Sequence, residues 1–341
     1  MSQTPLGPLH FEPIFKGALW GGRRLRPMFG ATPSAEATGE AWVLSDQGEN
    51  HSRVAGGPLQ GSTLRELMTT MPERILGGHS AAHGRFPLLL KFIDAAQPLS
   101  VQVHPNDRLA KTMSPPGGGS HAALGKTEAW VILDAEPDSR IYAGLARGVT
   151  RGDLLAALKG ETVEQTLHSF QPRPGDCVFL PASTNHAIVG GLLLFEVQQT
   201  SDITYRLHDW GRVDAKTGKP RDLHIEESLR CIDFERGPCA PVAPTIESSG
   251  PVVCERLASC DYFTLRRFRG SKPFAVGAAG KCRIIVGISG TTQLLHNFIR
   301  YPLRAGDLFL LPAETGTCQC FPMGEVTLLE CGMPKAAEGD A

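Results

Sequence analysis

The chain has 341 residues, of which 41% are hydrophobic and 20% are charged, and its formal net charge is −1. These values are typical of a soluble protein with a core large enough for more than one lobe. They exclude the strongly basic surface that nucleic-acid binding requires. The N-terminus shows no basic segment followed by an apolar run, and no apolar stretch reaches the ~18 residues of a membrane span, so we expect a cytoplasmic protein without a membrane partner.

Short strand patterns separated by turns dominate the chain, in which 38 glycines and 26 prolines are spread throughout. Apolar runs predict strands at residues 41–44, 88–93, 99–104, 129–133, 177–180, 192–198, 262–268, 283–288, 308–311 and 326–330. Helices are fewer and are predicted at residues 63–68, 72–76, 150–158 and 161–170. The pattern therefore favours a mainly β protein.

The nine cysteines form no Cys-x-x-Cys motif and no even framework. Most of them lie in apolar or strand-like surroundings, which favours buried, reduced thiols. Cys318 and Cys320 are expected on one face of a strand rather than at a zinc site.

Residues 99–104 carry two potential metal ligands, Gln102 and His104, at alternate positions of a predicted strand. Side chains two residues apart in a strand point to the same face. Lys126 and Glu128 form a second such pair, and His186 follows another strand pattern. We expect one divalent metal to be held by an amide, a carboxylate and two imidazoles, from Gln102, Glu128, His104 and His186.

The chain repeats part of itself. Residues 175–186 are similar to residues 306–317, and residues 125–128 are similar to residues 280–283. In the second copy Arg283 stands in place of Glu128 and Thr317 in place of His186, so that copy cannot hold the same metal. We expect a catalytic unit over residues 1–235 and a degenerate structural copy over residues 236–341.

The pattern of residues 175–186 resembles the second half-motif of the cupin family, whose small barrels bind a metal inside. Gln102, His104 and Glu128 fit the first half-motif, with wider spacing. The resemblance implies two cupin-type, jelly-roll-like β-barrels with a few short helices, the second barrel being degenerate. A ligand set without a thiolate suits zinc with an open position, and iron, manganese, nickel or cobalt fit the same ligands.

Polar residues follow the strand at 192–198. Glu196 and Gln198 share one strand face, and Asp202 and Arg206 come next in a predicted loop at the barrel rim. Arg206 is a fixed cation that can hold an anionic oxygen of a phosphate or an enediolate, whereas a solvated surface charge is the alternative.

Motifs along most of the chain are similar to those of class I mannose-6-phosphate isomerases of the short bacterial type. The similar segments are residues 19–22, 39–46, 86–96, 99–107, 125–133, 174–188, 192–212 and 223–226, and the similarity weakens after about residue 235. The resemblance implies one zinc ion per chain on the four ligands named above. It also implies an active-site role for Arg206, and a substrate pocket lined by Ser100, Lys126, Asp202 and Trp20.

The activity implied by the resemblance is the interconversion of mannose 6-phosphate and fructose 6-phosphate through a cis-enediol. Arg206 and Lys126 are the candidate catalytic cations, and the general base is left open between Lys126, Glu196 and a metal-linked group. Alternatives are an iron-dependent cupin dioxygenase and a sugar-binding regulatory cupin without turnover. The expected partner is a small sugar phosphate, whereas the exact sugar, the need for its phosphate, the native metal and the choice between monomer and homodimer are left open.

Overall fold

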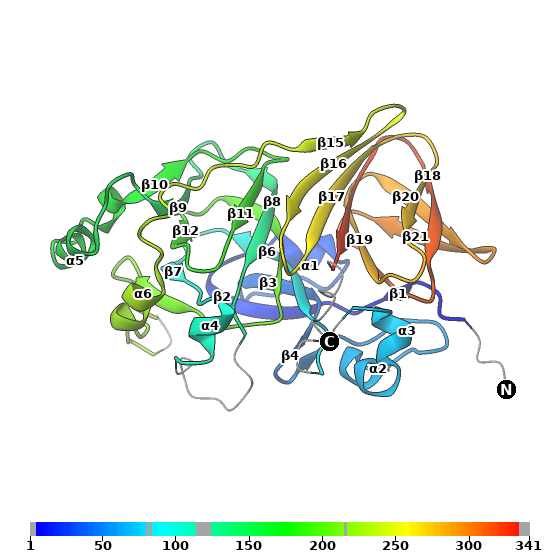
Figure 1. Ribbon diagram of the computed structural model, residues 1–341, viewed down its shortest axis with the longest axis horizontal. Helices are drawn as coiled ribbons and strands as arrows, with labels where there is room; N and C mark the ends of the chain where they lie inside the picture. Colours follow the sequence, from blue (N-terminus) through cyan, green and yellow to red (C-terminus); the bar gives the residue numbers. More distant parts are fainter. Residues whose placement is uncertain (1–4, 80, 82–83, 114–123, 215–216, 334–341) are drawn as a thin grey trace, which may run out of the picture.

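The computed structural model describes residues 5–79, 81, 84–113, 124–214 and 217–333, and over these residues it confirms the mainly β prediction (Figure 1). Every strand pairing in the described residues is antiparallel, as expected for strands joined by short turns. None of the helices in this part of the chain has the length and hydrophobicity needed to cross a lipid bilayer.

Two sheets form the first β-unit. The six-stranded sheet has the order β11 (Cys177–Leu180), β8 (Glu128–Ala135), β13 (Leu192–Gln199), β6 (Leu88–Ala95), β2 (Ile14–Gly22) and β3 (Thr38–Leu44). The five-stranded sheet has the order β10 (Leu167–Phe170), β9 (Ile141–Leu145), β12 (His186–Ile188), β7 (Val101–Val103) and β14 (Tyr205–His208). A small two-stranded ribbon, β4 (Asp46–Gln47) and β5 (Asn50–His51), lies beside them.

Two further sheets form the second β-unit. The seven-stranded sheet has the order β1 (Leu9–His10), β22 (Leu308–Leu311), β19 (Arg283–Ser289), β24 (Val326–Gly332), β17 (Thr264–Gly270), β16 (Val252–Ser259) and β15 (Thr245–Ser248). The four-stranded sheet has the order β18 (Phe274–Gly277), β23 (Thr317–Pro322), β20 (Thr291–His296) and β21 (Ile299–Arg304). Because β1 comes from the N-terminal part of the chain, the second unit is not made of C-terminal residues alone. The predicted domain boundary after residue 235 precedes β15. The division into a catalytic domain and a degenerate domain stays a prediction.

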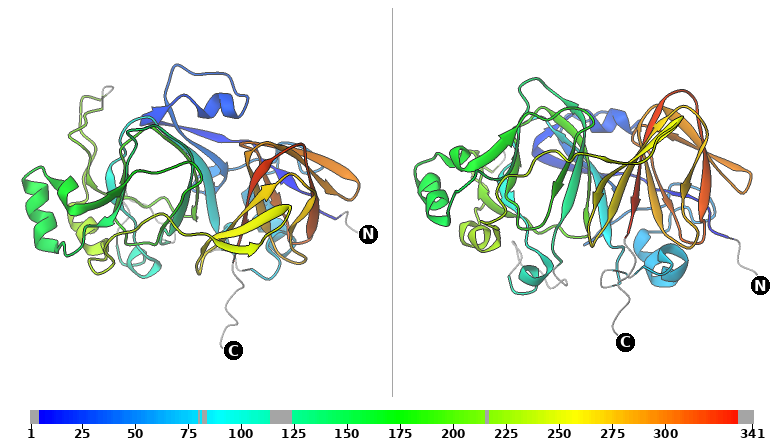
Figure 2. Two further views of the ribbon diagram at one scale, coloured as in Figure 1. Left: turned by 90° about the horizontal axis from the view of Figure 1, so that it is seen from above. Right: turned by 45° about the horizontal axis from the view of Figure 1, so that its top comes forward.

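The two units lie side by side (Figure 2). A shared apolar cluster joins their six- and seven-stranded sheets. Strand alternation explains how one strand serves two cores. In β8 the side chains of Ala129 and Val131 enter this cluster, whereas Trp130 and Ile132 belong to a separate cluster between the two sheets of the first unit. Both faces of the six-stranded sheet are therefore buried.

Phe195 lies in the middle of this junction, fully buried and with its ring centroid 5.3 Å from that of Phe92. We expect Phe195→Ala to lower the free energy of unfolding by ~3–5 kcal/mol, because it removes a large side chain from a packed core. Urea titration of the variant measures this loss as a lower transition midpoint. Phe298→Ala is the control, since Phe298 is 100% exposed and its removal should change stability by no more than ~0.5 kcal/mol; equal losses in the two variants would contradict the prediction.

Short helices pack against the β-units through buried apolar side chains. They are α1 (Leu25–Met28), α2 (Leu64–Thr70), α3 (Pro72–Leu76), α4 (Asp107–Ala110), α5 (Arg151–Lys159) and α6 (Ile225–Cys231). The predicted helices at 63–68, 72–76 and 150–158 are confirmed. Reciprocal side-chain and backbone hydrogen bonds of Thr63 with Glu66 and of Thr150 with Asp153 start α2 and α5 as capping boxes.

The predicted helix over residues 161–170 is wrong. Residues Val163–Thr166 form one 3-10 turn, and Leu167–Phe170 form β10, which pairs with β9. Val163 and Leu167 have the spacing of one helix face, but both are buried in the apolar cluster on the outer side of the five-stranded sheet. Residues 167–170 therefore pair with the edge of β9 as a strand, although the spacing of Val163 and Leu167 favours a helix.

All nine cysteines are free. Cys318 and Cys320 are buried on one face of β23, as predicted from their spacing. Burial raises the pKa of both thiols to about 11, which keeps them protonated and unreactive near neutral pH.

Candidate metal centre

The inner face of β7 begins the site. Val101 and Val103 are buried in the apolar cluster on the outer side of the five-stranded sheet. Gln102 and the following His104 therefore lie on the opposite face, toward the six-stranded sheet. This is the arrangement that the alternate spacing of the two residues predicted.

Two further strands bring the remaining predicted ligands to the same place. Glu128 is the first residue of β8 and pairs in register with Leu180 of β11 and Gln198 of β13. His186 is the first residue of β12 and pairs with Gln102 of β7. The site therefore joins both sheets of the first unit at one end of their strands.

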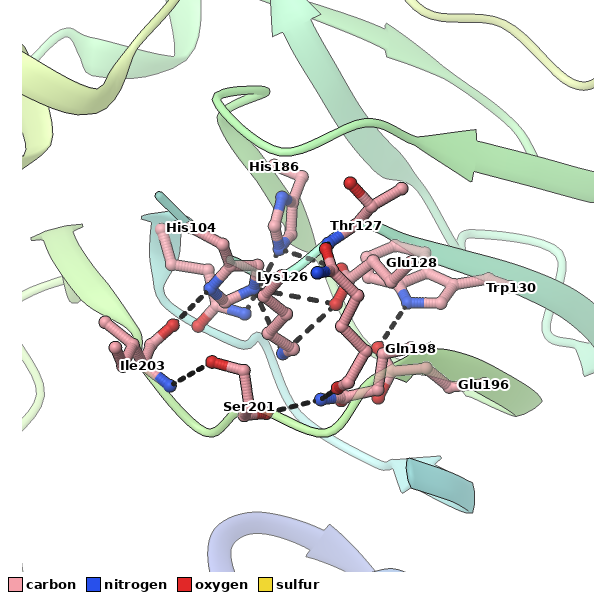
Figure 3. Close-up of polar contacts among 12 residues, drawn as sticks. His104, Lys126, Thr127, Glu128, Trp130, His186, Glu196, Gln198, Ser201 and Ile203 are labelled. Carbon is pink, nitrogen blue, oxygen red and sulfur yellow. Dashed lines mark hydrogen bonds and ion pairs between the residues drawn. The ribbon is translucent and has the colours of Figure 1, made fainter. Parts of the chain in front are cut away.

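The side chains of His104, Glu128 and His186 converge, and each is at most 2% exposed (Figure 3). His186 Nε2 lies 3.3 Å from Glu128 Oε1, and His104 Nε2 lies 3.6 Å from Glu128 Oε2. Among the described residues, this is the group of three His, Cys, Asp or Glu side chains whose donor atoms come close enough for a metal, all within 4.8 Å of one another. Gln102 Nε2 is 3.2 Å from His186 Nε2, which makes the amide a fourth member.

These separations fit a metal ion. Two ligand atoms that each lie ~2.1 Å from a tetrahedral zinc are about 3.4 Å apart, close to the observed distances. Both carboxylate oxygens of Glu128 are buried. Lys126 Nζ lies 3.0 Å from Oε2, whereas Oε1 has no hydrogen-bond donor among the described residues, which costs free energy unless a cation is near. Gln102 would present its oxygen to the ion after a rotation of the amide, whose N and O positions are interchangeable by a simple flip.

Backbone carbonyls orient both imidazoles. His104 Nδ1 is 2.8 Å from the carbonyl oxygen of Ile203, and His186 Nδ1 is 3.0 Å from that of Thr184. A carbonyl can only accept, so each Nδ1 carries the proton and each Nε2 directs its lone pair into the cluster. Burial, together with the charge of Lys126, lowers the pKa of His104 well below its usual range, and burial lowers the pKa of His186 to about 4. Both rings are thus neutral near pH 7, the form that binds metals.

Lys126 reaches the edge of the ligand cluster. Its Nζ lies 3.1 Å from His104 Nε2 and 3.0 Å from Glu128 Oε2, and the side chain is buried. The residue lies two positions before Glu128, in the segment that leads into β8 and not in the strand that was predicted to carry both residues. A fixed cation therefore stands next to the candidate metal ligands.

Lys91 is a site residue that the sequence analysis missed. It lies in β6, pairs in register with Glu196 of β13, and its Nζ is 2.9 Å from Glu196 Oε2. Trp130 donates from Nε1 to Glu196 Oε1 at 2.7 Å. Burial alone would raise the pKa of Glu196, but the ion pair with Lys91 lowers it below its usual range. The signal available in the sequence was a lysine inside the apolar run of β6, since a buried charge needs a partner.

Arg206 lies in β14, not in the rim loop that was predicted. It pairs in register with Gln102, which places the two side chains on the same face of the five-stranded sheet. Its Nη1 donates to the carbonyl oxygen of Asp222 at 2.9 Å, while its Nε is buried and has no partner in the part of the chain that the structure describes. Burial and then the charges of Arg221 and Arg212 lower its pKa, although a guanidinium stays charged at any ordinary pH. A buried N–H donor of the Arg206 guanidinium that has no hydrogen-bond acceptor among the described residues favours binding of an anionic ligand.

Three other predicted residues lie around this centre. Ser100 is buried, and its Oγ donates to Gln102 Oε1 at 3.2 Å. Asp202 is exposed and within electrostatic range of Lys91 and Lys126. Trp20 is buried in the apolar cluster that also contains Trp130. Their part in substrate binding stays a prediction.

Known proteins share this architecture. A family model for the phosphomannose isomerase type I catalytic domain matches residues 9–127, which include Gln102 and His104. A mannose-6-phosphate isomerase of Bacillus subtilis is 36% identical over 311 residues, covering 91% of this chain and 94% of the relative. The chain belongs to the type I phosphomannose isomerase family.

Other members of the phosphomannose isomerase family extend the match. A mannose-6-phosphate isomerase of Streptococcus mutans is 32% identical, covering 89% of this chain and 92% of the relative. The crystal structure of a mannose 6-phosphate isomerase from Bacillus subtilis superposes with a TM-score of 0.86 at 30% identity, covering 96% of this chain and all of the other. These findings confirm the expected family and its cupin-type fold, and the alignments extend well beyond the family model, which ends one residue before Glu128.

Proposed function

We propose that the protein interconverts mannose 6-phosphate and fructose 6-phosphate through a cis-enediol, using one bound zinc ion. The observation that carries the proposal is the buried cluster of His104, Glu128 and His186 with Gln102 beside it, in a chain of the phosphomannose isomerase family. The ligand set of two imidazoles, one carboxylate and one amide suits zinc with a position left for substrate. When bound, the ion would polarise the sugar oxygens at C1 and C2 and offset the charge of an enediolate.

Two cations of the chain face the same space. Lys126 Nζ lies within 3.1 Å of atoms of His104 and Glu128, and Arg206 lies across from Gln102 in the sheet. We assign to both the stabilisation of negative charge on the enediolate or on the substrate phosphate. Such preorganised positive charge acts on the transition state because it needs no rearrangement as the charge develops.

A proton must also move between C1 and C2. Glu196 is poorly suited to carry it, since its carboxylate is ion-paired with Lys91 and accepts a hydrogen bond from Trp130. Lys126 is closer to the ligand atoms, and we assign the proton transfer to it: Nζ as the free amine would take the carbon-bound proton, and the ammonium so formed would offset the enediolate charge and then return the proton to the neighbouring carbon. Ser100, Asp202, Glu196 and Trp20 are proposed to shape the substrate pocket around these groups.

A coupled assay tests the proposal. Purified protein with measured metal content is given mannose 6-phosphate, and formation of fructose 6-phosphate is followed by its onward enzymatic conversion. We expect turnover that is lost when a chelator removes the metal and regained when Zn²⁺ is added back. Mannose in place of mannose 6-phosphate, in a parallel reaction, shows whether the phosphate is required.

Other outcomes would favour the alternative activities. Metal-loaded protein that binds mannose 6-phosphate without turnover would indicate a sugar-binding regulatory cupin. Iron in the purified protein together with oxygen consumption would indicate a cupin dioxygenase. Either result would refute the proposed isomerase.

A further inference from the structure

The short segment that carries Lys126 and Glu128 into the site is held through its backbone. Each of residues 124–127 makes a backbone hydrogen bond to a group outside the segment. The Leu124 carbonyl accepts from Ser201 Oγ at 2.8 Å, and Gly125 N donates to Asp107 Oδ1 at 2.7 Å. Lys126 N donates to the Pro105 carbonyl at 3.0 Å, and Thr127 N donates to Gln199 Oε1 at 2.9 Å. We call residues 124–127 and these partners the clamp. Because the clamp fixes the backbone on both sides of Lys126, it sets where Nζ and the Glu128 carboxylate lie.

Asp107 is the centre of the clamp. Its Oδ1 accepts from Gly125 N and, at 3.1 Å, from Gln199 Nε2. One carboxylate therefore holds the segment at Gly125 directly and also orients Gln199, which binds Thr127. Its Oδ2 accepts from the hydroxyl of Tyr262 at 2.7 Å. A short hydrogen bond to a carboxylate is among the stronger ones in proteins.

Gly125 shows how close this approach is. A Cβ at this position would lie 2.6 Å from Asp107 N and 2.8 Å from the carbonyl carbon of Asn106. Only glycine allows the segment to reach Asp107 at this distance. The close approach is thus built into the backbone, and it brings Gly125 N to the Asp107 carboxylate.

Tyr262 comes from the second β-unit. It stands between β16 and β17, and the next residue, Phe263, is fully buried in the cluster that joins the two units. That anchoring fixes the tyrosine hydroxyl relative to the first unit. The contact therefore links the unit without the metal ligands to the segment that carries Lys126.

We propose that Tyr262 is a positioning residue for the isomerase reaction: through Asp107 it fixes Lys126 and Glu128 in the geometry that catalysis and metal binding need. The second β-unit thereby contributes to the active site although it supplies no ligand. This inference rests on the proposed function for its kinetic part, while its metal-binding part is independent of any turnover.

Tyr262→Phe tests the proposal, because it removes only the hydroxyl. We expect kcat for mannose 6-phosphate to fall about 5- to 10-fold with KM changed less than about twofold, and Zn²⁺ to be released to a chromophoric chelator at about 10-fold lower chelator concentration. The thermal transition should stay within a few degrees of that of the parent. A merely structural hydrogen bond would lower the transition temperature and leave kcat and zinc affinity of the folded protein unchanged.

Tyr301→Phe is the matched control. It makes the same chemical change in β21 of the same unit, away from the clamp, and should leave kcat and zinc release as in the parent. A double-mutant cycle with Asp107→Asn adds a second measure: if Tyr262 acts through Asp107, the two effects on zinc release combine to less than their product.

Several results would overturn the proposal. They are an unchanged kcat together with unchanged zinc release in Tyr262→Phe, an equal effect of Tyr301→Phe, or effects of Tyr262→Phe and Asp107→Asn that multiply in full. If the parent protein fails to convert mannose 6-phosphate, the proposed function fails, and the zinc-release measurements still decide whether Tyr262 orders the segment.

Discussion

Glu128→Gln should abolish stable metal binding and lower isomerase activity by at least ~100-fold, since replacing even the outer partners of metal ligands costs 10–100-fold. The substitution keeps the shape of the side chain and removes its charge. The remaining ligands, His104, His186 and Gln102, would then all be neutral, and a divalent ion would lack the one anion that offsets its own charge. Elemental analysis of the purified variant measures the metal, and the coupled assay measures the activity.

Glu330→Gln is the control for that experiment. Glu330 is also a buried carboxylate in a β-strand, and it accepts from Gly277 N at 2.7 Å in the second unit. A glutamine can still accept that hydrogen bond, so metal content and activity should be retained. Metal retained at the parent level in Glu128→Gln would contradict the assignment of this residue as a ligand.

Arg206→Ala should reduce kcat by about 100-fold while the metal content stays at the parent level. The expected loss is that of one preorganised charged donor in an active site, ~10²–10³ in kcat. Within the described residues, the Arg206 side chain donates to the carbonyl of Asp222 and to none of the predicted ligand atoms, so its removal should spare the metal. Steady-state kinetics together with elemental analysis separates the two effects.

Two variants sharpen this test. Arg206→Lys keeps the charge but not the forked donor geometry and should recover part of kcat. Arg300→Ala removes an arginine of β21 in the second unit and should change neither kcat nor metal content. Loss of zinc in Arg206→Ala would show that the residue supports the metal centre rather than the charged intermediate.

The strands were well predicted where apolar runs were continuous. The runs at 177–180 and 308–311 match β11 and β22 residue for residue, because strands buried on both faces carry few polar interruptions. Edge strands such as β15, whose residues are all exposed, were missed because their side chains carry no burial pattern. The prediction of a helix over 161–170 was wrong for a related reason. The spacing of apolar residues within a segment cannot show that the edge of another strand, here β9, lies beside it.

The site was predicted as far as its residues follow strand spacing. Gln102 with His104 and Lys126 with Glu128 are spaced two residues apart, which the sequence shows directly, although His104 lies just after β7 and Lys126 just before β8. Lys91 and Tyr262 were missed because their importance depends on partners 105 and 155 residues away, Glu196 and Asp107. Such pairings are set by tertiary structure and leave no short-range pattern.

The internal repeat offers a comparison within one chain. Strand register confirms the alignment of its copies: Glu128 faces Leu180, and Arg283 faces Leu311 at the matching position of the second unit. Arg283 lies 3.8 Å from Glu330, so an ion pair stands where the first unit gathers its candidate ligands. The β-unit is therefore compatible with either arrangement, and the ligands of the first unit are not needed for the fold.

The pairing of β1 with β22 has a consequence for how the chain is made. Leu9 faces Leu310, so β1 pairs with a strand that is synthesised about 300 residues later. At ~5–20 residues per second, that interval is roughly 15 to 60 s in a bacterial or eukaryotic cell. During this time the apolar residues Leu6, Leu9 and Phe11, all buried in the finished protein, lack their final neighbours. The N-terminal segment thus reaches its final packing only after residue 310 has been synthesised. Nascent chains shorter than this are the ones that most need protection from aggregation.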